Sequence, residues 1–501
     1  MVQSDDIFLL VKSLTKEEKI HFKRHGGVHV MGDGNNYIRL FDAIEAMKVY
    51  DEEALVRKFE GEKFTRQISV AKNYLYRAIL KSLKTIRRPR SKKEEILSLL
   101  AEVNILFEKR LYGQCKKLLR RAKKIALEYE KHPELMEILS WEMQLIYRED
   151  VLKRFSEENI NRIFDERKEL LKIRENLNEY DRLERNFKTL TGFVKDRESE
   201  EYKRKLRKFF AHPLLKGEEK ALSTVGRLKY YAIKANYFYE TQEDDKSFDY
   251  EIKQIRLLDD KPAVKSERFI DYLVLLSNTI LLCINLKKYE DYKWYLEKLR
   301  EQMDERIVLK NTSYQLYIIE RSYLMEMVYY NKQKDFAKIV ELYDRAKEKA
   351  EEKGMELRAT EDRNMRYFVC VGYFNMKEYS KALERLNEIL NDKEAESRPV
   401  EYITARIFNL VLHYELGNMD LLEYASASTQ RYIRERKRIS KFEMLFFRLM
   451  NRLVKRKPGK RESEIFEEFI YELKKLNAGE YRAEMRSMQF LVSWVESKVS
   501  T

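Results

Sequence analysis

The sequence predicts an all-α fold, in which a solenoid of helical hairpins is joined to a small helical N-terminal domain. Three observations lead to this prediction. Only 14 glycines and 6 prolines occur in 501 residues, whereas β-sandwiches need frequent turn residues and doubly wound α/β folds need glycine-rich phosphate turns. The chain is 37% charged and 44% hydrophobic, a composition typical of long amphipathic helices. Finally, one helix–turn–helix pattern recurs along most of the chain.

The N-terminal segment carries clear helix signals of its own. Thr15 and Glu18 form a capping-box pattern, which predicts a helix from about residue 16 to the glycines at 26 and 27. Four glycines between residues 26 and 34 predict a loop. Asp51 is expected to begin a short helix that ends near Phe59, followed by a longer helix over 63–86 with apolar residues at steps of three and four.

From about residue 94 the chain becomes a series of helix pairs. In each pair an apolar helix is followed by a short polar turn, a large apolar anchor residue, and a second amphipathic helix. From Phe248, which anchors a looser copy, the anchors lie 41, 47, 43 and 40 residues apart. The anchors of the five clearer copies are Tyr112, Tyr289, Phe336, Tyr379 and Met419.

The pattern around residues 367–382 resembles the tetratricopeptide repeat family, whose unit is a helix–turn–helix. The matching residues are Tyr373, Tyr379 and Ala382, at the family's characteristic steps. The spacing of 40–47 residues is longer than the 34 residues usual for that family. The resemblance implies that successive hairpins stack and that a ligand groove is lined by the first helix of each pair. It places Asn236, Asn278, Asn285, Lys332 and Asn375 in that groove, where asparagine side chains suit hydrogen bonding to a peptide backbone.

Breaks in the helical pattern divide the chain into four expected parts. Pro89 and the surrounding arginines interrupt the pattern after the N-terminal helices. The tract 157–201 is highly charged and poor in helix breakers, which predicts a long helix or a helical hairpin. The expected parts are an N-terminal helical domain over 1–90, a hairpin with long charged helices over 91–222, tetratricopeptide-like repeats over 223–440, and a C-terminal helical cap over 441–501.

The net charge of +15 is concentrated in four windows. Residues 84–93, 116–124, 431–438 and 452–461 together carry +22, so the rest of the chain sums to −7. Concentrated basic charge can bind phosphate backbones through counterion release, or acidic proteins and membrane surfaces. The simplest alternative is that these residues form solvent-exposed helix faces without a partner. The candidate residues in the first two windows are Lys84, Arg87, Arg88, Arg90, Lys92, Lys93, Lys116, Lys117, Arg120 and Lys124.

Residues 52–86 also fit a helix-turn-helix that reads DNA. The second helix of this segment is expected to expose Lys72, Arg77 and Lys81, residue types that contact bases and phosphates. The competing interpretation is a helical cap on the solenoid.

The sequence contains little that points to catalysis. His21 and His25 stand four residues apart, and His29 follows beyond two glycines, which is the most plausible metal cluster in the sequence. A surface helix end and loop is the better interpretation of these histidines, and no nucleotide loop, serine-hydrolase elbow or kinase signature occurs. The three cysteines are scattered over apolar stretches, as expected for buried thiols in a reducing compartment. We therefore expect no enzyme activity, metal or cofactor.

The resulting expectation is a cytoplasmic interaction scaffold that binds a peptide or protein segment in a helical-repeat groove. The alternative is a nucleic-acid-associated protein, either a DNA-binding regulator with a repeat sensor or an RNA or ribosome binder. The longest apolar stretch, residues 272–286, contains Ser277, Asn278, Thr279 and Asn285 and is shorter than the roughly 20 residues that span a bilayer, so no transmembrane segment is expected.

Overall fold

The computed structural model describes residues 5–25, 34–62, 65, 67–86, 91–150, 157–192, 199–392, 399–436, 441–455, 461–475 and 482–499. Throughout these residues the regular secondary structure is helical, so the predicted all-α class is confirmed. The chain divides into two compact units, residues 1–127 with 133–156, and residues 128–132 with 157–501.

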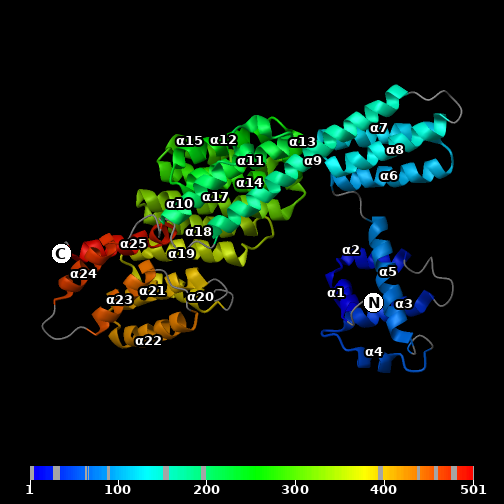
Figure 1. The fold of residues 1–501 in the computed structure, drawn as a ribbon. Helices are drawn as coiled ribbons and strands as arrows, with labels where there is room; N and C mark the ends of the chain where they lie inside the picture. Colours follow the sequence, from blue (N-terminus) through cyan, green and yellow to red (C-terminus); the bar gives the residue numbers. More distant parts are fainter. Residues whose placement is uncertain are drawn as a thin grey trace. The chain divides into compact units, whose positions relative to one another are not determined.

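The first unit contains eight labelled helices in the described part of the chain (Figure 1). They are α1 (Asp6–Ser13), α2 (Lys16–His25), α3 (Gly34–Ala46), α4 (Glu52–Lys58), α5 (Ile68–Ile86), α6 (Lys92–Glu108), α7 (Tyr112–Glu128) and α8 (His132–Asp150).

Helix α5 packs against α1, α2 and α3, and its Leu75 and Ile79 are fully buried in a core shared with Phe41.

The predicted capping box is present at the start of α2, where the Thr15 backbone N–H donates to Glu18 Oε2 at 2.9 Å and the Glu18 N–H donates to Thr15 Oγ1 at 3.2 Å. These bonds satisfy backbone donors that the first helical turn leaves without partners. Helix α1 was not predicted, because its apolar run over residues 7–11 is shorter than two helical turns.

Helices α6 and α7 form the first hairpin of the predicted kind. Cys115 of α7 is buried, with its Sγ 3.6 Å from the Val103 carbonyl oxygen of α6. Phe107 of α6 contacts both Tyr112, the anchor, and Trp141 of α8, with ring centroids 5.5 Å apart in each pair. The anchor ring therefore closes the hairpin.

The second unit continues with seventeen α-helices and three short 3-10 helices among its described residues. They are α9 (Glu157–Gly192), α10 (Glu200–Phe210), η2 (Pro213–Leu215), η3 (Glu218–Lys220), α11 (Thr224–Glu240), α12 (Asp244–Asp259), α13 (Pro262–Glu267), α14 (Phe269–Leu286), α15 (Tyr289–Glu301), η4 (Gln302–Asp304), α16 (Arg306–Leu309), α17 (Thr312–Gln333), α18 (Phe336–Glu351), α19 (Ala359–Asn375), α20 (Tyr379–Leu390), α21 (Pro399–Glu415), α22 (Met419–Arg436), α23 (Lys441–Val454), α24 (Glu462–Lys475) and α25 (Arg482–Val499).

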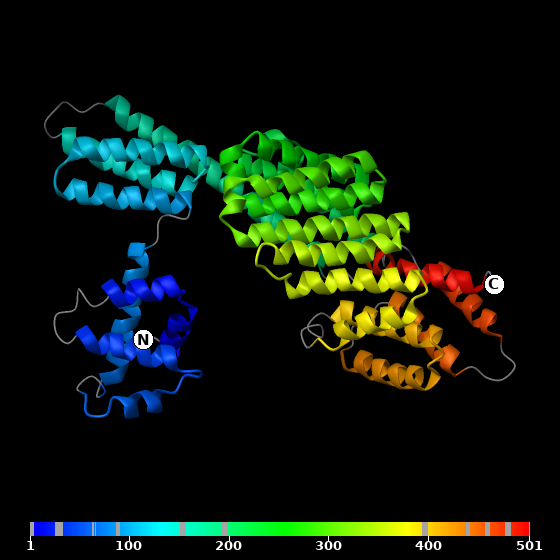
Figure 2. The same ribbon diagram turned by 180° about the vertical axis from the view of Figure 1, so that it is seen from behind.

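Five consecutive hairpins form the body of this unit: α11/α12, α14/α15, α17/α18, α19/α20 and α21/α22. Each second helix also packs against the first helix of the next hairpin, so the pairs stack in chain order (Figures 1 and 2). This is the tetratricopeptide-like solenoid that the sequence predicts. Stacking buries the apolar face that a single hairpin leaves exposed.

The predicted anchors mark the second helices. Tyr112, Tyr289, Phe336, Tyr379 and Met419 are the first residues of α7, α15, α18, α20 and α22. Phe248 lies four residues inside α12, as expected of the looser copy, and is buried. The predicted register of the hairpins is therefore confirmed.

The six hairpin turns share one backbone geometry that was not expected from the sequence. Each turn has one residue with φ between 59° and 69°. The following N–H donates to the carbonyl five residues earlier, for example Lys288 to Cys283 at 2.9 Å and Asn418 to His413 at 3.0 Å. This is the Schellman motif, in which a left-handed residue ends a helix. The left-handed residues are Arg110, Gln242, Lys287, Lys334, Lys377 and Gly417.

The long helix predicted in the charged tract is α9, which has 36 residues. It packs against α11, where Lys229 Nζ lies 2.8 Å from both Asp181 Oδ1 and Glu184 Oε2 of α9. Helix α9 thus precedes the hairpin α11/α12 in the chain and packs against its first helix.

Helix α14 is long and apolar enough to cross a membrane by length and composition, the only such helix among the described residues. In the fold, 61% of this helix is buried. It packs against α12, α15 and α17, which accounts for its apolar character as that of a core helix.

Candidate functional site

The shared turn geometry aligns the first helices residue by residue. Positions 13, 9, 6 and 2 before the left-handed residue form a line along one helix face, because steps of four and three return to the same side of an α-helix. We call these positions the first-helix stripe. In α14 the first-helix stripe consists of Val274, Asn278, Leu281 and Asn285.

All five groove candidates from the sequence fall on the first-helix stripe. Asn236 of α11 stands six residues before Gln242, and Lys332 and Asn375 stand two residues before Lys334 and Lys377. Asn236, Asn278 and Lys332 are exposed, whereas Asn285 and Asn375 are half-buried. Whether these residues bind a ligand stays a prediction.

Two of the asparagines donate one amide hydrogen bond to a backbone carbonyl of their own helix. Asn236 Nδ2 donates to the Ala232 carbonyl at 2.8 Å, and Asn375 Nδ2 donates to the Val371 carbonyl at 2.8 Å. An amide group has a second donor and an acceptor oxygen, so each keeps polar capacity for a ligand while its orientation is held by the helix.

The first-helix stripe of α14 is open and largely apolar. Val274 is 40% exposed and Leu281 is 36% exposed, and Ile270, one turn earlier, is 40% exposed. Asn278 and Asn285 flank Leu281 with amide groups. A solvent-facing row of aliphatic side chains with two amides has the chemistry of a surface for an amphipathic protein segment.

The same positions in α21 are covered. Phe408 and Val411 are fully buried, and Thr404 is buried. The C-terminal helix α25 accounts for part of this cover, because its Phe490 ring lies 4.7 Å from Phe408, 5.5 Å from Phe374 and 6.4 Å from Tyr367, measured between ring centroids. One aromatic side chain of α25 therefore contacts both α19 and α21.

A second aromatic residue fixes α25 against the end of the α21 stripe. The buried Trp494 donates from Nε1 to Glu415 Oε1 at 2.7 Å, and Lys498 Nζ lies 2.6 Å from the same oxygen. Burial, together with the negative charge of Glu415, raises the pKa of the neighbouring Tyr379 to about 12. Glu415 is thus an acceptor shared by α20 and α25.

The stripes of α17 and α19 are intermediate between these two cases. Arg321 of α17 pairs with Glu361 of α19 at 3.1 Å, which links the two helices across the stripe. Met325 of α17 and Val371 of α19 are buried, whereas Lys332 stays exposed. The stripe therefore becomes progressively less accessible from α14 to α21.

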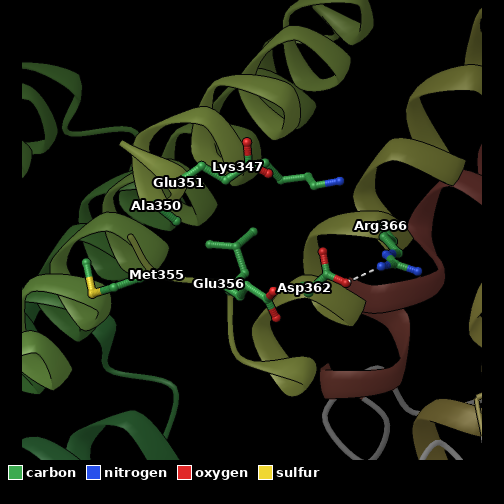
Figure 3. A pocket seen from close by; sticks show the side chains of 8 residues that line it. Lys347, Ala350, Glu351, Met355, Glu356, Asp362 and Arg366 are labelled. Carbon is green, nitrogen blue, oxygen red and sulfur yellow. Dashed lines mark ion pairs between the residues drawn. The ribbon is translucent and has the colours of Figure 1, made fainter. Parts of the chain in front are cut away.

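Two of the cavities in the described part of the chain lie beside the solenoid hairpins. One, of about 270 Å³, lies between the end of α18 and the start of α19 and is lined by Asp362 and Arg366 (Figure 3). Asp362 pairs with Arg366 at 2.5 Å and accepts from the Tyr343 hydroxyl at 2.8 Å, and Arg366 also pairs with Glu388 of α20. These charges connect α18, α19 and α20, which explains them as packing interactions. The other cavity, of about 480 Å³, is lined by Asp259, Lys265, Phe269, Glu305 and Arg306, among others.

The basic windows are divided between the two units. Lys116, Lys117, Arg120 and Lys124 are all exposed on α7, and Lys84 is exposed near the end of α5. Lys92 and Lys93 pair with Glu95 at 2.9 Å and Glu134 at 3.5 Å. Arg87, Arg88 and Arg90 lie outside the described residues. The other two windows lie in the second unit and include the ends of α22 and α23.

The structure corrects one part of the DNA-reading hypothesis. Lys72 was expected on the exposed face of α5, but it is buried, with its Nζ 2.5 Å from Glu52 Oε2 and 3.0 Å from the Tyr50 hydroxyl. Burial lowers the pKa of Lys72, but the hydrogen bonds from Lys72 to Glu52 and Tyr50 raise it above its ordinary value overall. Lys72 therefore ties α5 to α4, while Arg77 and Lys81 remain exposed.

No group of three or more metal-ligating side chains occurs within the described residues. His21 Nδ1 lies 3.0 Å from the Ser82 hydroxyl, which links α2 to α5. His29 and the side chain of His25 lie outside the described part of the chain. The three cysteines are buried free thiols, as expected, and burial raises the pKa of the Cys283 thiol to about 12.

Comparison with known proteins finds no matching family model and no matching curated protein. Among solved structures, the chain matches a signal transduction ATPase with numerous domains (STAND) that has a tetratricopeptide repeat sensor, from Pyrococcus horikoshii. The match has 16% identity and a TM-score of 0.31, and covers 84% of this chain but only 54% of that protein. The stacked hairpins themselves make this chain an all-α helical-repeat protein of the tetratricopeptide-like type.

Proposed function

We propose that the protein is a non-enzymatic cytoplasmic interaction scaffold that holds a helical protein segment on the first-helix stripe around α14. One observation carries the proposal: the molecule already holds a helix, α25, on the same stripe positions of α21. An amphipathic helix in a hydrophobic groove is a recurrent mode of peptide recognition.

The exposed residues of α14 support an apolar contact of useful size. Full burial of an aliphatic side chain contributes roughly 1.5–3 kcal/mol, and Ile270, Val274 and Leu281 are each still 36–40% exposed. Asn278 and Asn285 supply polar groups that orient a ligand. Helix α25 contacts the α21 stripe through Phe490 and Trp494, which are one helical turn apart. We therefore expect the ligand helix to carry two large apolar residues with the same spacing.

Site-specific photo-crosslinking tests this proposal. A benzophenone side chain at position 281 is expected to capture a discrete partner in cells, and Val274→Asp is expected to abolish the adduct. The matched control places the probe at Leu421, which is 54% exposed but lies on a second helix, α22. Equal adducts at positions 281 and 421, or adducts insensitive to Val274→Asp, would contradict the proposal.

A nucleic-acid-associated role is the second candidate, favoured by one feature of α7. Lys117 and Lys124 are exposed, and neither has an ion-pair partner among the described residues. Unpaired cations on one helix are suited to phosphate contacts, whose affinity falls steeply with salt.

Gel-shift measurements of salt dependence test this second role. Lys117→Glu with Lys124→Glu should weaken binding to duplex DNA or RNA and reduce its salt dependence. Lys172→Glu with Lys188→Glu on α9 is the charge-matched control, because Lys172 is paired with Glu169 at 2.6 Å and Lys188 with Glu184 at 2.7 Å. Absence of nucleic-acid binding at low salt would remove this role.

A further inference from the structure

The hairpin turns carry a feature that the first-helix stripe does not use. Three consecutive hairpins place a lysine at the left-handed position of the turn: Lys287 with φ 59°, Lys334 with φ 61° and Lys377 with φ 62°. The next hairpin has Gly417 there, with φ 69°. Glycine is the residue that this conformation favours, because a Cβ atom is unfavourable in it.

The lysine side chains contribute no visible contact to the fold. All three are exposed, and none of their side chains has an ion pair, a hydrogen bond or an aromatic partner among the described residues. Lys288, the neighbour of Lys287, differs in this respect: it pairs with Asp245 at 2.9 Å and lies 4.5 Å from the Phe248 ring centroid. The strained positions therefore carry the free ammonium groups, while the adjacent relaxed position makes the packing contact.

The three lysines lie at the same end of their hairpins. Each first helix runs antiparallel to its second helix, and each second helix packs against the next first helix, so the first helices run parallel. Helices α14, α17 and α19 also contact one another in sequence. Packed helices lie about 8–10 Å apart, so the three turns form a row with a spacing of that order. We call Lys287, Lys334 and Lys377 the lysine edge.

The surroundings of the lysine edge favour separate carboxylates over a continuous polyanion. Lys334 is followed directly by Asp335, which is exposed, and Lys377 by Glu378, which pairs with Lys381. These acids repel a chain that is negative at every unit, such as a nucleic acid. A polyproline II helix repeats every three residues with a rise of about 3.1 Å per residue. Acidic residues at every third position of such a segment therefore lie on one side, about 9 Å apart.

We propose that the lysine edge binds an acidic protein segment in polyproline II conformation, with a carboxylate at every third residue. This surface is distinct from the first-helix stripe and goes beyond the function proposed above. Backbone strain that is retained at three equivalent positions, whose side chains have no contact among the described residues, is expected where function requires the side chains.

Binding and stability measured together on the full chain test the proposal. The probe is a fluorescein-labelled peptide with four Glu-Pro-Pro repeats, followed by fluorescence anisotropy at low salt, where charge pairs are least screened. The triple variant Lys287→Gly, Lys334→Gly and Lys377→Gly should bind the peptide at least tenfold more weakly, while its urea midpoint stays equal or rises. Replacing the same three lysines with arginine should preserve binding.

Two control variants separate the lysine edge from general charge and from the first-helix stripe. Lys246→Gln with Lys293→Gln and Lys349→Gln removes the same charge at lysines that are paired with Glu243, Glu290 and Glu352, and should change affinity less than twofold. Val274→Asp with Leu281→Asp should also leave peptide binding unchanged, so this proposal can fail independently of the proposed function.

Three outcomes would overturn the proposal. Equal peptide affinity for wild type and the triple glycine variant would show that the lysine edge is not the site. A lower urea midpoint of the triple glycine variant would show that the lysines serve the fold, for example through the negative ends of the helix dipoles. Tighter lysine-dependent binding of a single-stranded oligonucleotide than of the peptide would assign the edge to nucleic acid.

Discussion

The hairpins α14/α15 and α21/α22 have the same backbone design but opposite surfaces. Both begin their second helix at the anchor residue, and both end their first helix with a Schellman motif. Yet Asn278 on the first-helix stripe of α14 is exposed, whereas Phe408 at the same position of α21 is fully buried. The repeat therefore determines where side chains point, and the neighbouring chain determines whether they meet solvent.

Later helices account for the difference in part: helix α23 packs against α21, and its Glu443 accepts from the stripe residue Thr404 at 3.5 Å. Helix α25 follows the hairpin α23/α24 and packs back onto α21. Its Phe490 contacts Phe408 and its Trp494 donates to Glu415, and both partners are stripe residues of α21. Aromatic residues of α25 face the covered stripe of α21, whereas the open stripe of α14 itself consists of aliphatic residues and asparagines. A helical-repeat protein can thus cap one part of a common face and keep another part for a ligand.

The largest expected effect comes from truncating the covered stripe. Phe408→Ala should lower the free energy of unfolding by about 3–5 kcal/mol, because it opens a cavity among Tyr367, Phe374 and Phe490. Asn278→Ala, at the equivalent exposed position, should change it by no more than about 0.5 kcal/mol. Urea unfolding followed by circular dichroism measures both, and similar losses in the two variants would break the comparison.

A buried carboxyl group next to the open hairpin should make stability depend on pH. Burial raises the pKa of Glu251 of α12 to about 8, although its hydrogen bond from the Thr279 hydroxyl at 3.0 Å lowers it. The folded state then holds the proton more tightly than the unfolded state. Stability should be greatest below about pH 4.5 for this group, and should fall by up to about 1.4 kcal/mol per pH unit until about pH 8.

Glu251→Gln checks this pH dependence. The variant should remove this group's slope between about pH 5 and 8, and should be the more stable protein at pH 9. The pH series of urea midpoints gives the result, and the same slope between about pH 5 and 8 in the variant as in wild type would show that the pKa of Glu251 is not raised in the fold.

A smaller effect is expected at the end of each stripe. Glu415→Ala leaves the buried Trp494 N–H without its acceptor and should cost about 1–3 kcal/mol. Asn285→Ala, at the equivalent position of α14, should cost about 0.5 kcal/mol or less. The fluorescence maximum of Trp494 should shift in the first variant, and equal costs in the two variants would argue against a selective role of α25.

The smallest effects come from exchanging the turn residues of the two hairpins. Lys287→Gly should stabilise the protein by about 0.5–1 kcal/mol and Gly417→Lys should destabilise it by a similar amount, because only glycine adopts this backbone region freely. A Cβ atom at Gly417 would meet no heavy atom within 4 Å, so steric contact does not complicate the exchange. Differential scanning calorimetry measures both shifts, and shifts of the same sign would contradict the backbone argument.

The sequence by itself predicted the helical class, the hairpins and their register. These follow from local rules, because the helical period of apolar residues, polar turns and anchors such as Tyr289 and Tyr379 can be read within one hairpin. Lys287, Lys334 and Lys377 were visible two residues before their anchors, but their left-handed backbone was not, because lysine gives no signal for that conformation. Helix α1 was not predicted, because the helices that pack against it, α3 and α5, come later in the chain. The burial of Lys72 was not predicted, because it depends on the ion pair with Glu52 of α4, which forms only when α4 and α5 pack together.

Only the tertiary structure decided which face of the solenoid is accessible. Val274 and Val411 are both valines on the same stripe, yet one is 40% exposed and the other fully buried. Phe408, on the same stripe as Val411, contacts Phe490 of α25, which follows α21 in the sequence after three further helices, so burial of this stripe involves contacts between residues far apart in the chain. Local periodicity fixes the direction of a side chain within its helix, whereas its burial depends on which distant segment folds back onto it.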